Sequence, residues 1–227
     1  MRTYYIALIF LTATLFSCKK ENKENYLTDD TCVEWKKVTV TDHSGYTINN
    51  SNIQIINTLF SANNIDKSRY RYYYYSNDSV QTYFPPYARF DQKIVRIKEF
   101  TNGLEIFTGH ILFHFKNNVF DLQNGNPTNG TPLSTTSNLT VQQVRTLFLG
   151  HIEQFDQRGD FYRDSCFCAE FGYFDLNAGI SNAPENLIKS WKITLKNKIY
   201  PFEIPIAYYQ DDDAKLIYYD NGIRTFR

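Results

Sequence analysis

Several motifs that would identify an enzyme are missing from this sequence. It has no Gly-x-Ser-x-Gly nucleophile turn, no phosphate-binding P-loop and no Gly-x-Gly-x-x-Gly dinucleotide loop. Its 24 basic residues are balanced by 24 acidic ones, so it lacks the positive charge that would attract nucleic-acid phosphates. No apolar run is long enough to cross a bilayer. We therefore expect a protein without catalytic residues, a cofactor or a nucleic-acid partner.

The first residues of the chain predict export. Arg2 is followed by an apolar stretch, Tyr4 to Phe16, which ends at the small residue Ser17. A positive residue, a short apolar core and a small residue before the cleavage point are typical of a secretory signal peptide, here residues 1–17. The cysteine that follows, Cys18, resembles the lipobox cysteine of bacterial lipoproteins. The alternative is an ordinary signal peptide that happens to precede a cysteine.

The lipoprotein resemblance implies a membrane anchor and a location. In that family the cysteine becomes the first residue and is acylated, and two or three acyl chains hold a protein firmly on a bilayer. Residues 18–30 are charged and polar without apolar periodicity, which predicts a flexible tether. Lys19 follows the cysteine, and by resemblance to Gram-negative lipoproteins this allows transfer to the outer membrane. We expect a lipid-anchored protein of the cell envelope that faces either the periplasm or the cell surface, with Cys18 as its membrane contact.

Two predicted helices repeat one pattern. The segment Ile53–Phe60 recurs as Val141–Phe148, and most positions are identical or exchange one aliphatic residue for another. In each segment the apolar residues fall on one helical face. Each segment also has a capping-box pattern at its start: Ser51 with Gln54, and Thr140 with Gln143. We therefore predict two amphipathic helices.

Strand patterns follow each predicted helix. Four follow the first helix and four the second: Arg69–Tyr75, Lys93–Phe100, Leu104–Phe115, Asn118–Leu122, Cys166–Phe174, Ser190–Leu195, Tyr200–Gln210 and Lys215–Tyr219. Asn102-Gly103 predicts a two-residue hairpin turn. We expect an α+β fold of two tandem two-layer units, each with one helix packed on an antiparallel sheet of about four strands. The units would span residues 31–123 and 138–227, joined by a polar linker at 124–137.

Three segments resemble protease propeptides. Ile94–Phe107, with its strand, Asn-Gly turn and second strand, is similar to the propeptides of thermolysin- and fungalysin-like metalloproteases. Leu187–Ile193 and Asp213–Ile217 resemble parts of a PepSY unit, although Ala214-Lys215 stands where that family often has glycine. The resemblance covers roughly residues 50–227 and implies cystatin-like units that chaperone or inhibit a protease. The sequence contains no His-Glu-x-x-His motif, so we expect any such role to be directed at a separate protein.

Three cysteines remain besides the lipidated one: Cys32, Cys166 and Cys168. An exported protein can form disulfides, but two cysteines separated by one residue are badly placed to bond each other. We expect Cys32 to pair with one of the other two; the alternatives are buried free thiols, or a redox or metal role. The turn Asp211–Asp213 is either simply solvated or a calcium ligand. The four histidines are not spaced to share a metal ion, and we expect no metal site.

An aromatic run predicts a binding surface. Strand alternation puts the even-numbered residues of segment 70–75 on one face and the odd-numbered residues on the other. One face should pack under the first helix, and the other would present aromatic and arginine side chains to a partner. With two rings of the loop 83–87, the candidate surface comprises Tyr70, Arg71, Tyr72, Tyr73, Tyr74, Tyr75, Phe84 and Tyr87. The alternative is that these rings form cross-strand pairs that only stabilise the sheet.

These features favour a binding module over an enzyme. We predict a lipid-anchored envelope protein that engages a protein partner, and the propeptide resemblance suggests an exported protease as that partner. The alternative is an accessory lipoprotein of nutrient capture or envelope maintenance, which binds a glycan or small ligand with Tyr72, Tyr74 and Phe84 stacking on sugar rings. A third class, a hydrolase with an unrecognised site, has no motif in its favour.

Overall fold

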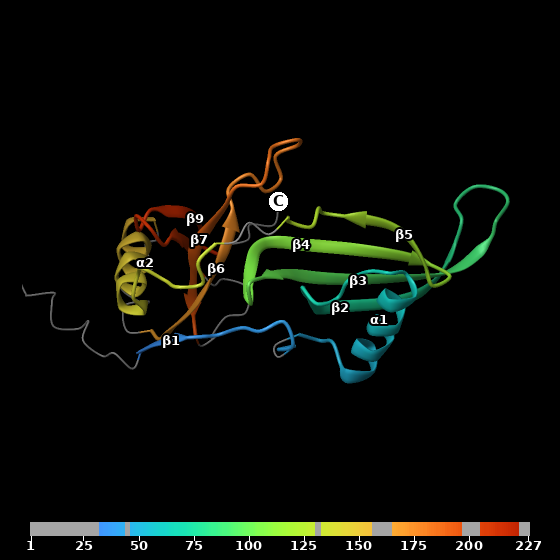
Figure 1. Ribbon diagram of the computed structural model, residues 1–227, viewed down its shortest axis with the longest axis horizontal. Coiled ribbons are helices and arrows are strands. Elements are labelled where there is room, and N and C mark those ends of the chain that lie inside the picture. The colour runs from blue at the N-terminus through green and yellow to red at the C-terminus, as the bar shows by residue number, and fades with distance from the viewer. Residues whose placement is uncertain (1–31, 44–45, 130–132, 156–164, 197–204, 223–227) are drawn as a thin grey trace, which may run out of the picture. The chain divides into compact units, whose positions relative to one another are not determined.

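The computed structural model describes residues 32–43, 46–129, 133–155, 165–196 and 205–222 (Figure 1). The predicted signal peptide, lipidation site and tether lie outside the described residues. Within them the chain forms nine strands and two helices: β1 (Val33–Trp35), α1 (Asn50–Ala62), β2 (Tyr70–Gln81), β3 (Arg89–Thr101), β4 (Leu104–Lys116), β5 (Val119–Asn124), α2 (Val141–Phe155), β6 (Phe167–Asp175), β7 (Leu187–Leu195), β8 (Ile206–Gln210) and β9 (Leu216–Asp220). No helix in this part of the chain is long and apolar enough to cross a membrane.

The strands belong to one mixed sheet. Its main path runs in the order β2-β3-β4-β6-β7-β8-β9, with β5 beside β4 and β1 beside β6. The pairs β4–β6 and β1–β6 are parallel, and the other neighbours are antiparallel. β4 bends near its start (Figure 1) and joins two halves of the sheet: the first half is β2 to β5, and the second half is β1 with β6 to β9. Its C-terminal part pairs with β5, while Ile106 near its start pairs with Tyr173 of β6.

This sheet overturns the predicted fold. The chain does not form two cystatin-like helix-on-sheet units; it is mainly β, with two helices on one nine-stranded mixed sheet in the described residues. In the predicted fold each of the two sheets would end in an edge strand with unpaired backbone groups. Local sequence patterns do not show which distant strand pairs with such an edge. Here β4 continues into β6, and β1, which precedes α1 in the chain, pairs with β6 of the other half.

The close approach of β4 and β6 requires a glycine. A Cβ atom on Gly172 would lie 2.4 Å from the carbonyl oxygen of Glu105 and 2.8 Å from the ring of Phe107. A side chain at this position would force the two strands apart. The junction has a small buried core of its own, made by Ile106, Tyr173 and Leu187.

Both predicted helices are confirmed, and each packs on the sheet with its apolar face. α1 buries Ile56, Leu59 and Phe60 in a core with residues of β2, β3 and β4. α2 buries a second set in a core with β6, β7 and β8: Val144, Phe148, Leu149 and Ile152. The sequence repeat therefore gives each half of the sheet a covering helix.

The two helices begin at different caps. α1 starts after Asn49, whose side chain accepts a hydrogen bond from the Asn52 N–H at 2.8 Å, so the predicted cap at Ser51 is wrong by two residues. At α2 the predicted capping box is confirmed, because the Thr140 N–H donates to Gln143 Oε1 at 2.8 Å and the Gln143 N–H donates to Thr140 Oγ1 at 3.3 Å. Asparagine and threonine are both effective caps, and the position of the first apolar residue does not choose between neighbouring ones.

Two long hairpins build the first half of the sheet. Asn102 and Gly103 have φ angles of 50° and 78°, which is the two-residue turn predicted between β3 and β4. The β2–β3 hairpin is longer than predicted, because β2 continues to Gln81 and β3 begins at Arg89. The end of this hairpin, residues 82–88, therefore lies beyond the part of β2 that packs in the α1 core, and we call it the tip loop.

Candidate binding surfaces

The aromatic run at the start of β2 is divided between core and surface. Tyr72 is 4% exposed in the α1 core, where its hydroxyl donates to Asn57 Oδ1 at 3.0 Å. Burial raises the pKa of Tyr72 to about 12. A bulge between Tyr72 and Tyr74 breaks the alternation, so the arrangement predicted beyond Tyr72 is wrong. Tyr70 and Tyr75 pack against the same core, whereas Tyr74 is 37% exposed.

Arg71 is buried in a charged cluster. It is 3% exposed and lies 3.5 Å from Glu105, whose other carboxylate oxygen pairs with Lys98. The ring of Tyr46 lies 4.7 Å from the guanidinium, and Tyr73 packs beside Tyr46 at a ring distance of 5.5 Å. Arg71 is therefore paired with a charge inside the protein and is not an exposed contact residue. Its burial was not foreseen, because its partner Glu105 lies in another strand.

The tip loop carries the most exposed aromatic side chains in the described part of the chain. Tyr83, Phe84 and Tyr87 are 87%, 74% and 64% exposed. The rings of Tyr83 and Phe84 meet edge to face at 5.0 Å. Of the eight predicted surface residues, Phe84 and Tyr87 are therefore mostly exposed. Tyr83, which was not among the eight, is exposed beside them.

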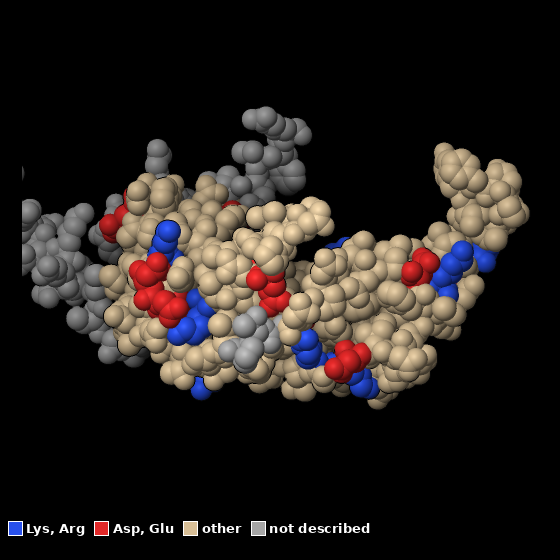
Figure 2. All heavy atoms as spheres, turned by 45° about the horizontal axis from the view of Figure 1, so that its top comes forward, with Lys and Arg blue, Asp and Glu red and all other residues tan. Residues whose placement is uncertain are grey.

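Hydrogen bonds hold the ends of the tip loop together. The Thr82 N–H donates to Ala88 O, the Ala88 N–H donates to Thr82 Oγ1, and the Thr82 hydroxyl donates to Pro86 O, each at 2.9 Å. Two prolines within the loop further restrict its backbone. Figure 2 shows the projecting end of the hairpin without charged side chains, while basic and acidic residues gather at its base. The tip is thus a small, apolar and preorganised projection.

A polar cleft lies where the two halves of the sheet meet. It has a volume of about 710 Å³ and is lined by residues 108–110 of β4, residues 125–129 after β5, and residues 175 and 177–185 between β6 and β7. A shift in the β3–β4 register between Lys98 and Phe100 lets residues 106–109 bulge at this point. His110 lines the cleft, and removal from water together with the nearby Lys98 charge lowers the pKa of its imidazole. Sequence patterns did not reveal the cleft, because its walls come from three distant segments.

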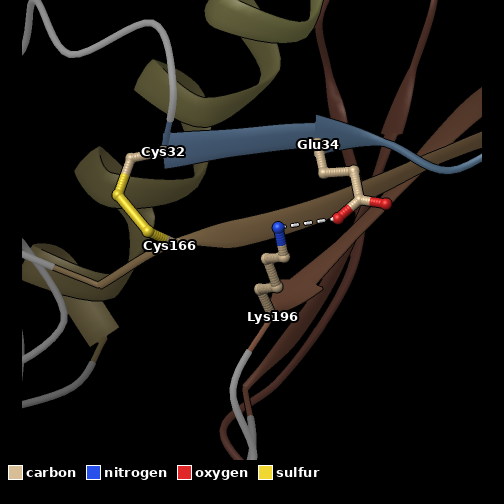
Figure 3. Close-up of a disulfide and its surroundings, with 4 residues drawn as sticks. All are labelled: Cys32, Glu34, Cys166 and Lys196. Carbon is tan, nitrogen blue, oxygen red and sulfur yellow. Dashed lines mark ion pairs between the residues drawn. A yellow bond between two sulfur atoms is a disulfide. The ribbon is translucent and has the colours of Figure 1, made fainter.

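Cys32 and Cys166 form a disulfide at the starts of β1 and β6 (Figure 3). Next to it Glu34 of β1 pairs with Lys196 at 2.9 Å, and this contact lowers the pKa of the Glu34 carboxyl. The third cysteine, Cys168, is free and half-buried, and burial raises the pKa of its thiol. The disulfide therefore ties the N-terminal strand to the second half of the sheet.

The acidic turn between β8 and β9 contains a fully buried carboxylate. Asp211 accepts hydrogen bonds from the N–H groups of Asn138 and Leu139 and, at 3.0 Å, from Trp191 Nε1. Lys189 lies 2.9 Å from it. Burial alone would raise the pKa of Asp211, but these donors and the lysine lower it. Its oxygens are thus used to join the start of α2 to the sheet, and no group of three His, Cys, Asp or Glu residues in the described ranges is placed to hold a metal ion.

The other histidines make structural contacts. His43 Nδ1 lies 3.0 Å from Tyr72 O, and His151 Nδ1 lies 2.8 Å from Leu147 O on its own helix. His114 is half-buried in β4. Within the described residues, the exposed rings of the tip loop and the polar cleft are two candidate surfaces for a partner or ligand.

Comparison with known protein families, with curated proteins and with solved structures finds no match to this chain. The lipoprotein and propeptide resemblances rest on the sequence segments alone.

Proposed function

We propose that this protein is a lipid-anchored binding module of the cell envelope, and that it holds a protein partner through the tip loop. One observation carries the proposal: three large rings, Tyr83, Phe84 and Tyr87, are mostly exposed on a loop whose ends are hydrogen-bonded together. Aromatic side chains provide a large contact area with few rotatable bonds, and a loop that is already ordered loses little entropy on binding. An apolar projection of this kind fits a concave apolar groove on another protein.

The predicted lipid anchor at Cys18 and the tether at 18–30 agree with this role. A lipid anchor confines the protein to the membrane surface, and a flexible tether lets the tip loop reach a partner there. An exported protease is the partner class that we would test first, because its active-site cleft is concave and the propeptide resemblance suggests it. The stacking alternative has less support, because Tyr72 is buried and Tyr74 lies within β2, away from Phe84 in the tip loop.

Affinity capture from envelope extracts tests the proposal. The bait starts at Asn25, which keeps the whole unit Thr31–Arg227. The test variant replaces all three tip rings by alanine: Tyr83→Ala, Phe84→Ala and Tyr87→Ala. The control is Tyr218→Ala, which removes a ring that is 51% exposed on β9, the edge strand at the other end of the sheet.

We expect a protein that is retained by the wild type and by Tyr218→Ala and is lost from the triple variant. The captured protein should then bind directly to the purified wild type and to Tyr218→Ala, and should not bind to the triple variant. Equal capture by all three baits, or no capture by the wild type, would count against the tip loop as a binding site. If the partner is a protease, its activity on a peptide substrate shows whether binding inhibits it.

A further inference from the structure

We propose that the polar cleft between the two halves of the sheet binds a hydroxyl-rich ligand, a short neutral oligosaccharide. This site is independent of the tip loop and of the proposed protein partner. Its volume of about 710 Å³ falls within the range of ordinary ligand pockets. Three features support the assignment: the walls are preformed, most of their polar side chains are neutral, and small apolar surfaces lie between those groups.

The walls of the cleft are held by hydrogen bonds within the protein. Asp175 Oδ1 accepts from the N–H groups of Asn177 and Asn186 at 3.0 and 2.9 Å, which fixes both ends of the loop 175–186. Asn177 Nδ2 donates to Pro184 O at 2.7 Å across the same loop. A preformed site spares the ligand the entropy cost of ordering it.

The wall opposite is fixed in the same way. The Thr128 N–H donates to the buried carboxylate of Glu99, and the Asn129 N–H donates to Glu185 Oε2 at 2.7 Å. Gly125 packs so closely on β4 that a Cβ atom there would lie 2.6 Å from His110 O. Each of the two carboxylates of the lining, Asp175 and Glu185, therefore has one oxygen bound to backbone amides, while the buried Glu185 Oε1 has no hydrogen-bond partner among the residues that the structure describes.

The other side chains that remain for a ligand are neutral amides and hydroxyls. Within the described residues, no hydrogen-bond partner is found for the side chains of Asn126, Ser181 and Asn182, which line the cleft. These groups can both donate and accept, as sugar hydroxyls do. No Lys or Arg is among the described lining residues, which disfavours phosphorylated ligands.

Apolar patches complete the match to a sugar. Ile180 is 58% exposed, and Pro127 and Pro184 also line the cleft. Sugar rings have C–H faces between their hydroxyls, and such a face packs on isolated aliphatic side chains. A purely apolar ligand would leave these amides and the buried Glu185 Oε1 without partners, whereas a sugar hydroxyl can donate to that oxygen.

Titration followed by amide NMR tests this proposal. The ¹⁵N-labelled chain from Asn25 onward is titrated separately with maltotriose, cellotriose and N,N′,N″-triacetylchitotriose, all neutral, and with calcium chloride. We expect at least one trisaccharide to give saturable shifts in residues 108–110, 125–129 and 175–185. Ser181→Trp fills the cleft from an exposed loop position and should weaken that binding by about tenfold or more.

Ser61→Trp, at an exposed position on α1, is the matched control and should bind as the wild type does. The proposal is overturned if none of the three trisaccharides gives shifts at millimolar concentration, or if the shifts lie outside the cleft. It is overturned equally if only calcium binds, or if Ser61→Trp weakens binding as much as Ser181→Trp. Amide spectra of both variants show directly whether each is folded.

Discussion

The two halves of the sheet carry the same helix pattern but are fastened by different contacts. In the first half, α1 is joined to β5 by Asn63, which donates to Asn118 O at 2.9 Å and accepts from the Phe120 N–H at 2.8 Å. In the second half the buried Asp211 joins the start of α2 to the sheet, and a disulfide holds β1 on β6. A repeated apolar stripe is thus enough to place a helix on a sheet, whereas the polar contacts that fix it are particular to each half.

The halves also differ in what they expose. The first half projects the long β2–β3 hairpin with its apolar tip loop. The second half contributes the loop 175–185, which encloses the polar cleft only because β6 lies beside β4. A projection suits the groove of another protein, and an enclosed polar cleft suits a small ligand. The two proposed sites therefore follow from the difference between the halves and from the junction that joins them.

Removing the disulfide should cause the largest loss of stability, and that loss should begin in the second half of the sheet. Cys32 and Cys166 are separated by 134 positions, and closing so long a loop restricts the unfolded chain strongly. The double variant Cys32→Ser, Cys166→Ser should lose about 4 kcal/mol of unfolding free energy, measured by urea denaturation. Hydrogen exchange should rise first in β1 and β6. Faster exchange in β2 and β3 instead would show that the disulfide does not act on the second half.

Gly172→Ala should separate the two halves from each other. The added methyl group collides with the backbone of Glu105, and we expect a loss of about 3 kcal/mol. Both tryptophans, Trp35 and Trp191, lie in the second half, so fluorescence reports on that half alone while far-UV circular dichroism reports on both. The two signals should coincide for the wild type and diverge for the variant.

Gly150→Ala is the control for that experiment. No atom lies within 4 Å of the Cβ position at Gly150 in α2, so alanine should gain up to about 1 kcal/mol from its helix propensity. If Gly172→Ala unfolds as the wild type does, β4 and β6 are not packed as closely as described. If both signals still coincide but at lower stability, the halves unfold together despite the strain.

Gly172 also marks the boundary of what the sequence could predict. The helices, the Asn102-Gly103 turn and most strands were predicted correctly, because their patterns involve neighbours in the chain. The pairing of β4 with β6 joins distant segments, and its local signal was a glycine inside a strand, which indicates a close backbone approach. The exposure of Phe84 followed from a proline-containing loop, whereas the burial of Arg71 depended on Glu105 in another strand.

Asp211→Asn should loosen the second half alone. The asparagine keeps the shape but loses the charge and acceptor capacity that serve Leu139, Trp191 and Lys189, so we expect a loss of about 2 kcal/mol at neutral pH. Tryptophan fluorescence should shift, because the Trp191 indole loses a charged acceptor. Asp212→Asn is the control; its side chain is 56% exposed and its ion pair with Lys189 should contribute less than about 1 kcal/mol.

The Asp211 contribution should disappear in acid. Its pKa is lowered in the folded protein from an ordinary value of 3.8, so the stabilisation is complete above that value and is lost as the pH falls through the lower, folded pKa. The difference between wild type and Asp211→Asn should therefore shrink only below about pH 4. The raised pKa of the Glu99 carboxyl changes the stability with pH in the opposite direction. Wild type and variant both contain Glu99, so its effect cancels in the difference between them. A difference that is constant down to pH 2 would mean that the charge of Asp211 is not what stabilises the fold.

The smallest effects should come from the two helix caps, and they compare the halves most directly. The Asn49 side chain accepts a hydrogen bond from the Asn52 N–H in α1 at 2.8 Å. The Thr140 side chain accepts the equivalent bond from the Gln143 N–H in α2 at 3.3 Å. Asn49→Ala should therefore cost about 1 kcal/mol, and Thr140→Ala about half of that. Urea unfolding of both single variants and of the double variant measures the costs, which should add because the helices lie in separate cores. A double variant that loses clearly more than the sum would show that the helices are coupled through the junction, and that the repeat is one cooperative structure.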